Sequence, residues 1–157
     1  PHSVINVTVT AIGGENAVSG AKRFQKDVLR LEPDLITIDY GRNDMFLTEE
    51  EMRMAWESMI RAAHQKNIKV LLITPAADSG AIYYEPEKRK LTDQQMAEII
   101  RELAEEYGTG LADAEAVFED LFAHGHRRSE YAASVNHPNR RGHEIVADCL
   151  AEWFPYC

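Results

Sequence analysis

Residues 35–44 read LITIDYGRND, and this stretch decides the fold that we expect. Its first half is apolar or β-branched, which is typical of a short strand buried inside a sheet. Gly41 ends the strand, and the polar residues Arg42, Asn43 and Asp44 follow at once. Ligand sites in open parallel sheets lie beyond the carboxyl ends of the strands. The stretch therefore predicts a central strand followed directly by a functional loop.

Strand and helix patterns alternate on both sides of this stretch. Strands are expected at 5–11, 35–40, 70–73 and 111–112. Apolar residues at helical spacing fill the intervals, and a last helix is expected from about Arg140 to Phe154 with Trp153 on its inward face. Capping boxes that begin at Thr48 and Thr92 mark two helix starts. This alternation predicts an α/β fold with a flavodoxin-like parallel sheet between two helical layers, a three-layer α/β/α arrangement.

Composition narrows the class of protein. The 157 residues, 45% of them hydrophobic, suit one globular domain over 1–157. The net charge of −9 argues against nucleic acid or an anionic membrane as a partner, and no apolar run reaches the ~20 residues of a membrane span. Cys149 and Cys157 are too few for a disulfide framework. Reduced thiols favour a cytoplasmic location, and Cys149 is expected in the core.

Three loops at the expected strand ends carry chemistry-bearing residues. The pair Gly13-Gly14 lets backbone N–H groups turn toward a ligand. Asn43 can direct its amide at a developing oxyanion. His137 precedes a proline and a helix start, where it is well placed as a general base. Each also has a plainer interpretation: a strand-to-helix turn, an Asx turn, and a surface histidine beside an Asn139 N-cap.

Together the three loops resemble the sequence blocks of the SGNH (GDSL-type) serine hydrolases. The second block of that family is a glycine in a Gly-rich turn, matched by Gly14. Its third block, Gly-x-Asn-Asp, is matched by residues 41–44, and its fifth, Asp-x-x-His followed by Pro, in part by residues 134–138. Each match alone is weak, but all three occur in the family's order on the expected elements.

The resemblance implies ester hydrolysis through an acyl-enzyme, with no cofactor and no metal. His137 would activate a serine as general base. The side-chain amide of Asn43 and the backbone N–H of Gly14 would stabilise the oxyanion. The substrate would be a small-molecule acyl ester, with acetylated carbohydrate as one candidate.

Two departures from the family pattern matter. The first block, Gly-Asp-Ser, is absent, so the nucleophile is not in this chain and the domain is expected to be incomplete at its N-terminus. Ser3, for example, precedes an expected strand, whereas the nucleophile should follow one. Ser134 occupies the usual position of the acid, so a backbone carbonyl or Glu130 would have to orient His137. The chain alone is therefore expected to be inactive.

The missing block also removes a strand. The family fold places its first strand in the middle of the sheet, between the strands expected here at 5–11 and 35–40. Both neighbours would then expose unpaired N–H and C=O groups, each of which costs about 1–3 kcal/mol when left dry. We expect the slot to be filled by an upstream segment of the same protein or by a strand from another copy in a homo-oligomer.

Other interpretations stay open at this point. A non-catalytic binding module on the same scaffold would explain the missing serine and acid. An unrelated flavodoxin-like domain is disfavoured, because no phosphate-cradling glycine loop ends the first expected strand. His124 and His126 lack cysteine or carboxylate partners at metal-ligand spacing, so they are interpreted as surface residues. Tyr83-Tyr84 suits a sugar-stacking platform and loop packing about equally.

Overall fold

The computed structural model describes residues 5–77, 86–134 and 137–154. The α-helices are α1 (Ala17–Asp27), α2 (Glu49–His64), α3 (Asp93–Tyr107), α4 (Ala114–Ala123) and α5 (Arg140–Ala151). The strands are β1 (Leu35–Ile38), β2 (Lys69–Ile73), β3 (Gly110–Ala112), β4 (Ala132–Ser134) and β5 (His137–Pro138). Short 3₁₀ turns are η1 (Leu29–Leu31), η2 (Gly41–Phe46), η3 (Pro86–Lys88) and η4 (Arg128–Glu130).

The central sheet is parallel, with its described strands in the order β1-β2-β3. Ile36 pairs with Val70, and Leu72 pairs with Leu111. Each strand is followed by a helical segment that returns the chain to the other end of the sheet, as parallel pairing requires. The parallel sheet predicted from the apolar runs is thereby confirmed.

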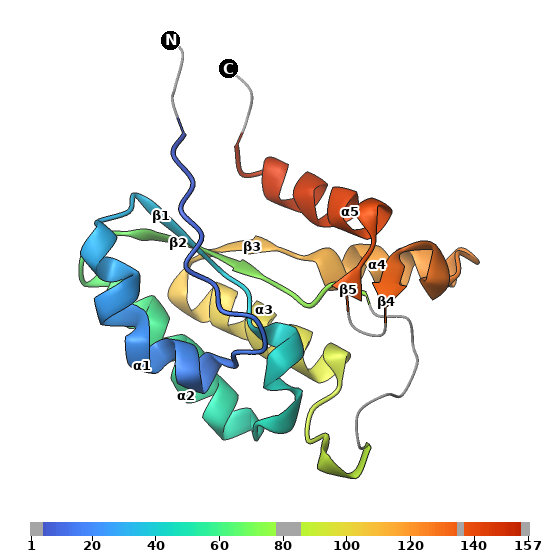
Figure 1. Ribbon diagram of the computed structural model, residues 1–157, viewed down its shortest axis with the longest axis horizontal. Helices are drawn as coiled ribbons and strands as arrows, with labels where there is room; N and C mark the ends of the chain where they lie inside the picture. The colour runs from blue at the N-terminus through green and yellow to red at the C-terminus, as the bar shows by residue number, and fades with distance from the viewer. Residues whose placement is uncertain (1–4, 78–85, 135–136, 155–157) are drawn as a thin grey trace.

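Helices cover both faces of the sheet (Figure 1). Alternate side chains of β2 point to opposite faces: Val70 and Leu72 pack in the core cluster formed with α1, α2 and α3. Leu71 and Ile73 pack in a second cluster, formed with α4 and α5. The predicted three-layer α/β/α fold is confirmed.

The helix ends follow the signals in the sequence. Thr48 and Thr92 each accept a hydrogen bond from the backbone N–H three residues on, and Glu51 and Gln95 complete the two capping boxes. Gly108 ends α3 in the left-handed conformation, at φ 61°. The two capping boxes fix where α2 and α3 begin, after the loops at the carboxyl edge of the sheet. Gly108 fixes where α3 ends, before β3.

The strand predicted at 5–11 does not form. This segment has no strand partner among the described residues, and Ile5, Val7 and Val9 are 66%, 82% and 80% exposed. The alternation of apolar and polar residues is present, but a strand also needs a neighbour to pair with its backbone. The segment runs past the sheet without joining it (Figure 1). β1 is likewise shorter than predicted and ends at Ile38.

The last helix is also shorter than predicted. α5 ends at Ala151, so Trp153 lies beyond it and is 50% exposed, which corrects its predicted inward position. Its indole N–H donates to the carbonyl of Leu111 at 3.0 Å, which lays the ring against β3. Cys149 is buried as predicted. Cys157 and Tyr83-Tyr84 lie outside the described residues.

Among the described residues, no helix is long and apolar enough to cross a membrane. The cytoplasmic location expected from the two cysteines stays a prediction.

Candidate active site

The Gly13-Gly14 turn leads directly into α1. The N–H of Glu15 donates to the carbonyl of Ile12 at 3.2 Å, which closes a four-residue turn. Gly14 stands third in that turn at φ 77°, a conformation that glycine adopts without steric cost. Arg23 in α1 binds the Glu15 carboxylate at 2.5 and 2.9 Å and lowers the pKa of Glu15. The turn is therefore anchored to the helix that follows it.

Asn43 lies in η2, immediately after β1. Its backbone N–H donates to the carbonyl of Tyr40 at 2.9 Å, and the residue is half-buried. The neighbouring Asp44 is fully buried and accepts hydrogen bonds from the N–H of Ala17 and the indole of Trp56, both at 2.7 Å. Burial raises the pKa of Asp44 to about 6, against the effect of these two hydrogen bonds. Asp44 thus joins the start of α1, three residues after Gly14, to the turn that carries Asn43.

A second contact supports η2 from the loop before α3. The N–H groups of Lys90 and Leu91 donate to the carbonyl of Met45 at 2.8 and 3.2 Å. Arg42, the neighbour of Asn43, binds the carboxylate of Asp93 at 2.7 Å. The conformation of η2 is therefore determined by bonds to two other segments as well as by its own turn.

His137 lies in a small antiparallel hairpin that the sequence did not reveal. β4 pairs with β5, and the backbone of Ser134 stands opposite His137. Asn139 N-caps α5 by accepting from Gly142 N–H at 3.1 Å, and its amide donates to the carbonyl of Glu130 at 2.9 Å. His137 itself is exposed. The N-cap predicted at Asn139 is confirmed and holds the end of the hairpin in place.

Glu130, one candidate for orienting His137, is engaged with other groups. Its carboxylate accepts from the N–H of Arg127 at 3.0 Å and lies 3.5 Å from the guanidinium of Arg141. The ring of His126 is 3.8 Å away. The hydrogen bond from Arg127 is the main cause of the lowered pKa of Glu130. A role of Glu130 toward His137 stays a prediction.

Two of the predicted site residues, Gly14 and Asn43, lie in turns, and the third, His137, lies in strand β5. Asp44 links the Gly14 turn to Asn43. His137 stands apart in the hairpin beyond the carboxyl end of β3, beside α5 (Figure 1). Convergence of the three on one cleft, within about 10 Å of one another, stays a prediction.

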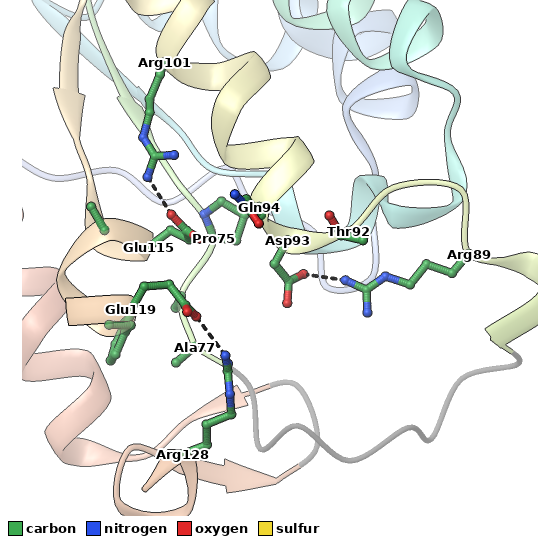
Figure 2. A pocket seen from close by; sticks show the side chains of 13 residues that line it. Pro75, Ala77, Arg89, Thr92, Asp93, Gln94, Arg101, Glu115, Glu119 and Arg128 are labelled. Atoms are coloured by element: carbon green, nitrogen blue, oxygen red, sulfur yellow. Dashed lines mark hydrogen bonds and ion pairs between the residues drawn. The ribbon is translucent and has the colours of Figure 1, made fainter. Parts of the chain in front are cut away.

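A cavity of about 630 Å³ adjoins η2, and sequence reasoning missed it. It lies between the segment after β2 and the starts of α3 and α4, and three Arg–carboxylate pairs surround it (Figure 2). Thr74, fully buried at the end of β2, donates to Asp113 at 3.0 Å and accepts from the N–H of Glu115 at 2.9 Å. One signal in the sequence could have indicated this region: the polar residues Thr74 and Asp113 directly follow the strands β2 and β3.

The arginine beside this network is firmly held. Arg101 donates to both carboxylate oxygens of Asp113, at 2.7 and 2.8 Å, and to Glu115 at 2.5 Å. Burial raises the pKa of Asp113, but hydrogen bonds from Arg101 and Thr74 outweigh it and leave that pKa below its usual value. The Arg101–Asp113 pair beside this wall of the cavity is therefore ionised at neutral pH.

The described residues contain no group of three or more His, Cys, Asp or Glu side chains that could hold a metal ion. His124 contacts the carbonyl of Asp120 at 2.8 Å, and His126 contacts the hydroxyl of Tyr131 at 3.0 Å.

The three-layer α/β/α fold is that of the SGNH hydrolases. The GDSL-like lipase/acylhydrolase family matches residues 1–145, and the chain belongs to that family. The resemblance seen in the three sequence blocks is confirmed.

Several characterised proteins are similar to the chain. An acetylxylan esterase of Geobacillus stearothermophilus is 24% identical, over 94% of this chain and 71% of its own. The crystal structure of an acetyl xylan esterase, AlAXEase, superposes with a TM-score of 0.76 at 24% identity, covering 92% of this chain and 78% of the other. A putative GDSL-like lipase from Parabacteroides merdae has a TM-score of 0.74 at 20% identity, over 88% and 68% of the two chains.

One further similar structure is that of a catalytic mutant. Axe2, an acetylxylan esterase from Geobacillus stearothermophilus, has been solved as a catalytic mutant with the serine at its fifteenth position replaced by alanine. It superposes with a TM-score of 0.77 at 20% identity, over 92% of this chain and 69% of that one. Family and relatives together support esterase activity.

Proposed function

We propose that the chain is the larger part of a serine esterase that hydrolyses small acyl esters, with acetylated carbohydrate as its substrate class. The observation that carries the proposal is the buried Asp44, which joins the Gly14 turn to the turn of Asn43. Two oxyanion donors from separate segments need such a connection to stay aligned, since a displacement of about 1 Å can lower a rate 10²-fold. The names of the relatives support the acetyl and carbohydrate parts.

The roles follow from the chemistry of acyl transfer. A ring nitrogen of His137 takes the proton of a serine hydroxyl while the serine oxygen bonds to the acyl carbon. Asn43 and Gly14 donate to the oxyanion that forms. The C–O bond to the alcohol then breaks, and His137 gives the proton to the leaving oxygen. Water, activated by the same histidine, releases the acid and restores the serine.

The serine in this proposal comes from a Gly-Asp-Ser segment outside the 157 residues. That segment would form a strand beside β1, with its serine at the carboxyl edge near Asn43. Two observations support this placement. β1 has β2 as its only strand neighbour among the described residues, and the segment 5–12 exposes the apolar side chains of Ile5, Val7, Val9 and Ile12.

A non-catalytic binding module is the second candidate. Ser134 stands where the family has its acid, and the Glu130 carboxylate is engaged with Arg127, Arg141 and His126. Without an orienting acid, His137 would be a weaker base, although a hydrolase that lacks one triad member keeps part of its rate.

Hydrolysis of p-nitrophenyl acetate separates the two candidates. We expect the 157-residue chain to show no more turnover than its His137→Ala variant. The chain preceded by a strand that carries the Gly-Asp-Ser block of the family should hydrolyse the substrate, and His137→Ala or Asn43→Ala should remove that activity. An extended chain that folds but stays inactive would favour the binding module. Robust activity of the bare chain, insensitive to His137, would refute the assignment of the nucleophile.

A further inference from the structure

The described walls of the cavity beside η2 are charged, and their charges balance. Among the described residues, six charged side chains line it: Arg89, Asp93, Arg101, Glu115, Glu119 and Arg128. They form three pairs, with N–O distances of 3.0 Å for Arg89–Asp93, 2.5 Å for Arg101–Glu115 and 2.8 Å for Arg128–Glu119. Figure 2 shows the pairs around one hollow. The part of the wall that the structure describes therefore carries three positive and three negative charges.

This balance disfavours a charged ligand. Helix N-termini normally attract anions, and both α3 and α4 begin at this cavity. Their first turns already hold carboxylates, Asp93 in α3 and Glu115 in α4. A ligand carboxylate or phosphate would have to displace these groups from their arginines, and a cationic ligand would have to displace the arginines.

A neutral polyhydroxylated ligand avoids this competition. A hydroxyl group both donates and accepts, so one hydroxyl can accept from an arginine and donate to the carboxylate paired with it. The paired side chains stay accessible, with exposed fractions between 12% and 51%. Pro75 and Ala116 also line the cavity, and they supply apolar surface for the C–H groups of a sugar ring. A volume of about 630 Å³ suits a ligand of a few rings.

The cavity also adjoins the proposed catalytic turn. Asp93 belongs to the cavity wall through its pair with Arg89, and it also binds Arg42 at 2.7 Å. Arg42 is the residue before Asn43. The cavity wall is therefore linked to the turn that carries Asn43 through the Arg42–Asp93 ion pair.

We propose that this cavity binds the neutral sugar part of an acetylated oligosaccharide while the acetyl group reaches Asn43. The inference rests on the proposed esterase function for its orientation. Specificity for sugar esters over simple acetates then comes from the charge-balanced wall at the starts of α3 and α4. Arg101 and Arg128 are the specificity-determining cations of this wall, because each forms a pair that a hydroxyl can bridge.

Binding of a product-like sugar tests the site without requiring turnover. The probe is xylotriose, titrated into the 157-residue chain and followed by NMR, including the side-chain Nε–H signals of arginine. We expect weak, saturable binding that shifts the signals of Arg101 and Arg128. Trigalacturonic acid, of similar size but anionic, should bind at least tenfold more weakly. Shifts confined to other residues, or equal binding of the two sugars, would overturn the proposal.

Two tryptophan substitutions on one helix give the matched comparison. Ala116 lines the cavity, whereas its neighbour Val117 is an exposed residue outside the lining. Ala116→Trp should fill the cavity and raise the Kd for xylotriose about tenfold or more. Val117→Trp should bind xylotriose as the unmodified chain does. Wild-type binding by Ala116→Trp would also overturn the proposal.

The same measurements keep the two proposals apart. If the extended chain hydrolyses no ester but xylotriose still shifts Arg101 and loses affinity in Ala116→Trp, the sugar site stands and the esterase fails. If p-nitrophenyl acetate is hydrolysed through His137 but xylotriose does not bind, the esterase stands and the sugar site fails.

Discussion

The carboxylate of Asp44 accepts the backbone N–H of Ala17 at 2.7 Å, and this bond spans 27 residues of sequence. It connects the first residue of α1, three residues after Gly14, with the 3₁₀ turn η2, which carries Asn43. The second oxygen accepts the indole of Trp56 in α2 at 2.7 Å. Asp44, the aspartate of the Gly-x-Asn-Asp block, therefore joins the two segments as a buried acceptor. The proposed role of the neighbouring Asn43 is to donate its side-chain amide to the oxyanion.

Removal of this connector should lower stability. Asp44→Ala leaves the indole N–H of Trp56 and the N–H of Ala17 without their acceptor. Each unsatisfied buried donor costs about 1–3 kcal/mol, so for two donors we expect a loss of about 2–6 kcal/mol in the free energy of unfolding. Urea unfolding at pH 7 measures it. Asp120→Ala, at a carboxylate that is 72% exposed, is the control and should change stability by less than about 0.5 kcal/mol. Equal effects of the two substitutions would contradict the connector role.

The buried carboxylate should also make stability depend on pH. The pKa of Asp44 is raised by burial from the ordinary 3.8 to about 6, so the folded state binds this proton more tightly than the unfolded chain does. The stabilising contribution is complete below 3.8 and is lost as pH rises through about 6. At ~1.4 kcal/mol per pKa unit, the contribution is at most about 3 kcal/mol.

Asp44→Asn removes the titration of residue 44. Asp39, whose pKa is raised to about 6 by burial and further by the charge of Asp44, still titrates in the variant. The unfolding free energy of the wild type minus that of the variant should decrease between about pH 4 and pH 6.5. Parallel pH profiles of the two proteins would show that Asp44 does not titrate in this range.

The sequence revealed those parts of the fold that depend on local signals. Capping boxes at Thr48 and Thr92 and the αL glycine Gly108 set helix ends without help from distant residues. The hairpin of β4 and β5 was missed because it is short and because Ala132-Ala133 has no strand propensity. Its form depends on the contacts of Tyr131 and Asn139 with each other, which periodicity cannot show.

The candidate site likewise has parts that the sequence could predict and parts that it could not. Gly14 and Asn43 could be named from short motifs, because a glycine turn and a Gly-x-Asn-Asp block are contiguous in sequence. The cavity could not, because two of the three Arg–carboxylate pairs in its described wall join different elements. Arg101 in α3 reaches Glu115 in α4, and Arg128 in η4 reaches Glu119 in α4, whereas Arg89 and Asp93 are only four residues apart. Charge pairs between different elements can be identified only once the positions of the helices in the fold are known.

Gly14 and Gly13 should respond differently to alanine. An alanine at φ 77° is strained by about 1–2 kcal/mol, and relief of that strain would turn the Gly14 N–H away from its present direction. Gly13 has no positive φ, and a Cβ there meets open space. In the extended chain, Gly14→Ala should lower kcat for p-nitrophenyl acetate at least tenfold, with Gly13→Ala as the matched control that retains activity. Equal activity of both variants would exclude Gly14 from the oxyanion site.

Gly142 should be needed for the position of the His137 hairpin. A Cβ at Gly142 would lie 2.4 Å from the carbonyl oxygen of Tyr131 and 2.8 Å from Cβ of Pro138. Alanine normally stabilises a helix interior by about 1 kcal/mol relative to glycine, but overpacking of this kind costs about 1–3 kcal/mol. Gly142→Ala should therefore destabilise the chain and shift the ring NMR signals of His137. A more stable variant with unchanged His137 signals would show that the hairpin is not held against α5.

The last prediction concerns the open edge of the sheet. Among the described residues β1 has a strand neighbour on one side only, and the segment that should lie beyond the slot exposes Val7 and Val9 at 82% and 80%. Exposed apolar positions at alternate residues, beside an unpaired strand edge, form a template for another strand. We expect the slot to be filled in the working protein, by an upstream segment or by a second copy.

The double variant Val7→Lys/Val9→Lys distinguishes a sheet whose slot is filled by another strand from a sheet that is complete without one. Lysine at these exposed positions should leave α1–α5 folded, since neither valine belongs to the core. It should nevertheless lower the mass of any oligomer of the 157-residue chain in sedimentation analysis, because charges on an edge strand oppose pairing. In the chain extended by the Gly-Asp-Ser strand, the same change should reduce protection of the β1 amides against hydrogen exchange. Two results together would show that nothing occupies the slot. The 157-residue chain would be monomeric at all concentrations, and the β1 amides of the extended chain would exchange as fast as those of the 157-residue chain.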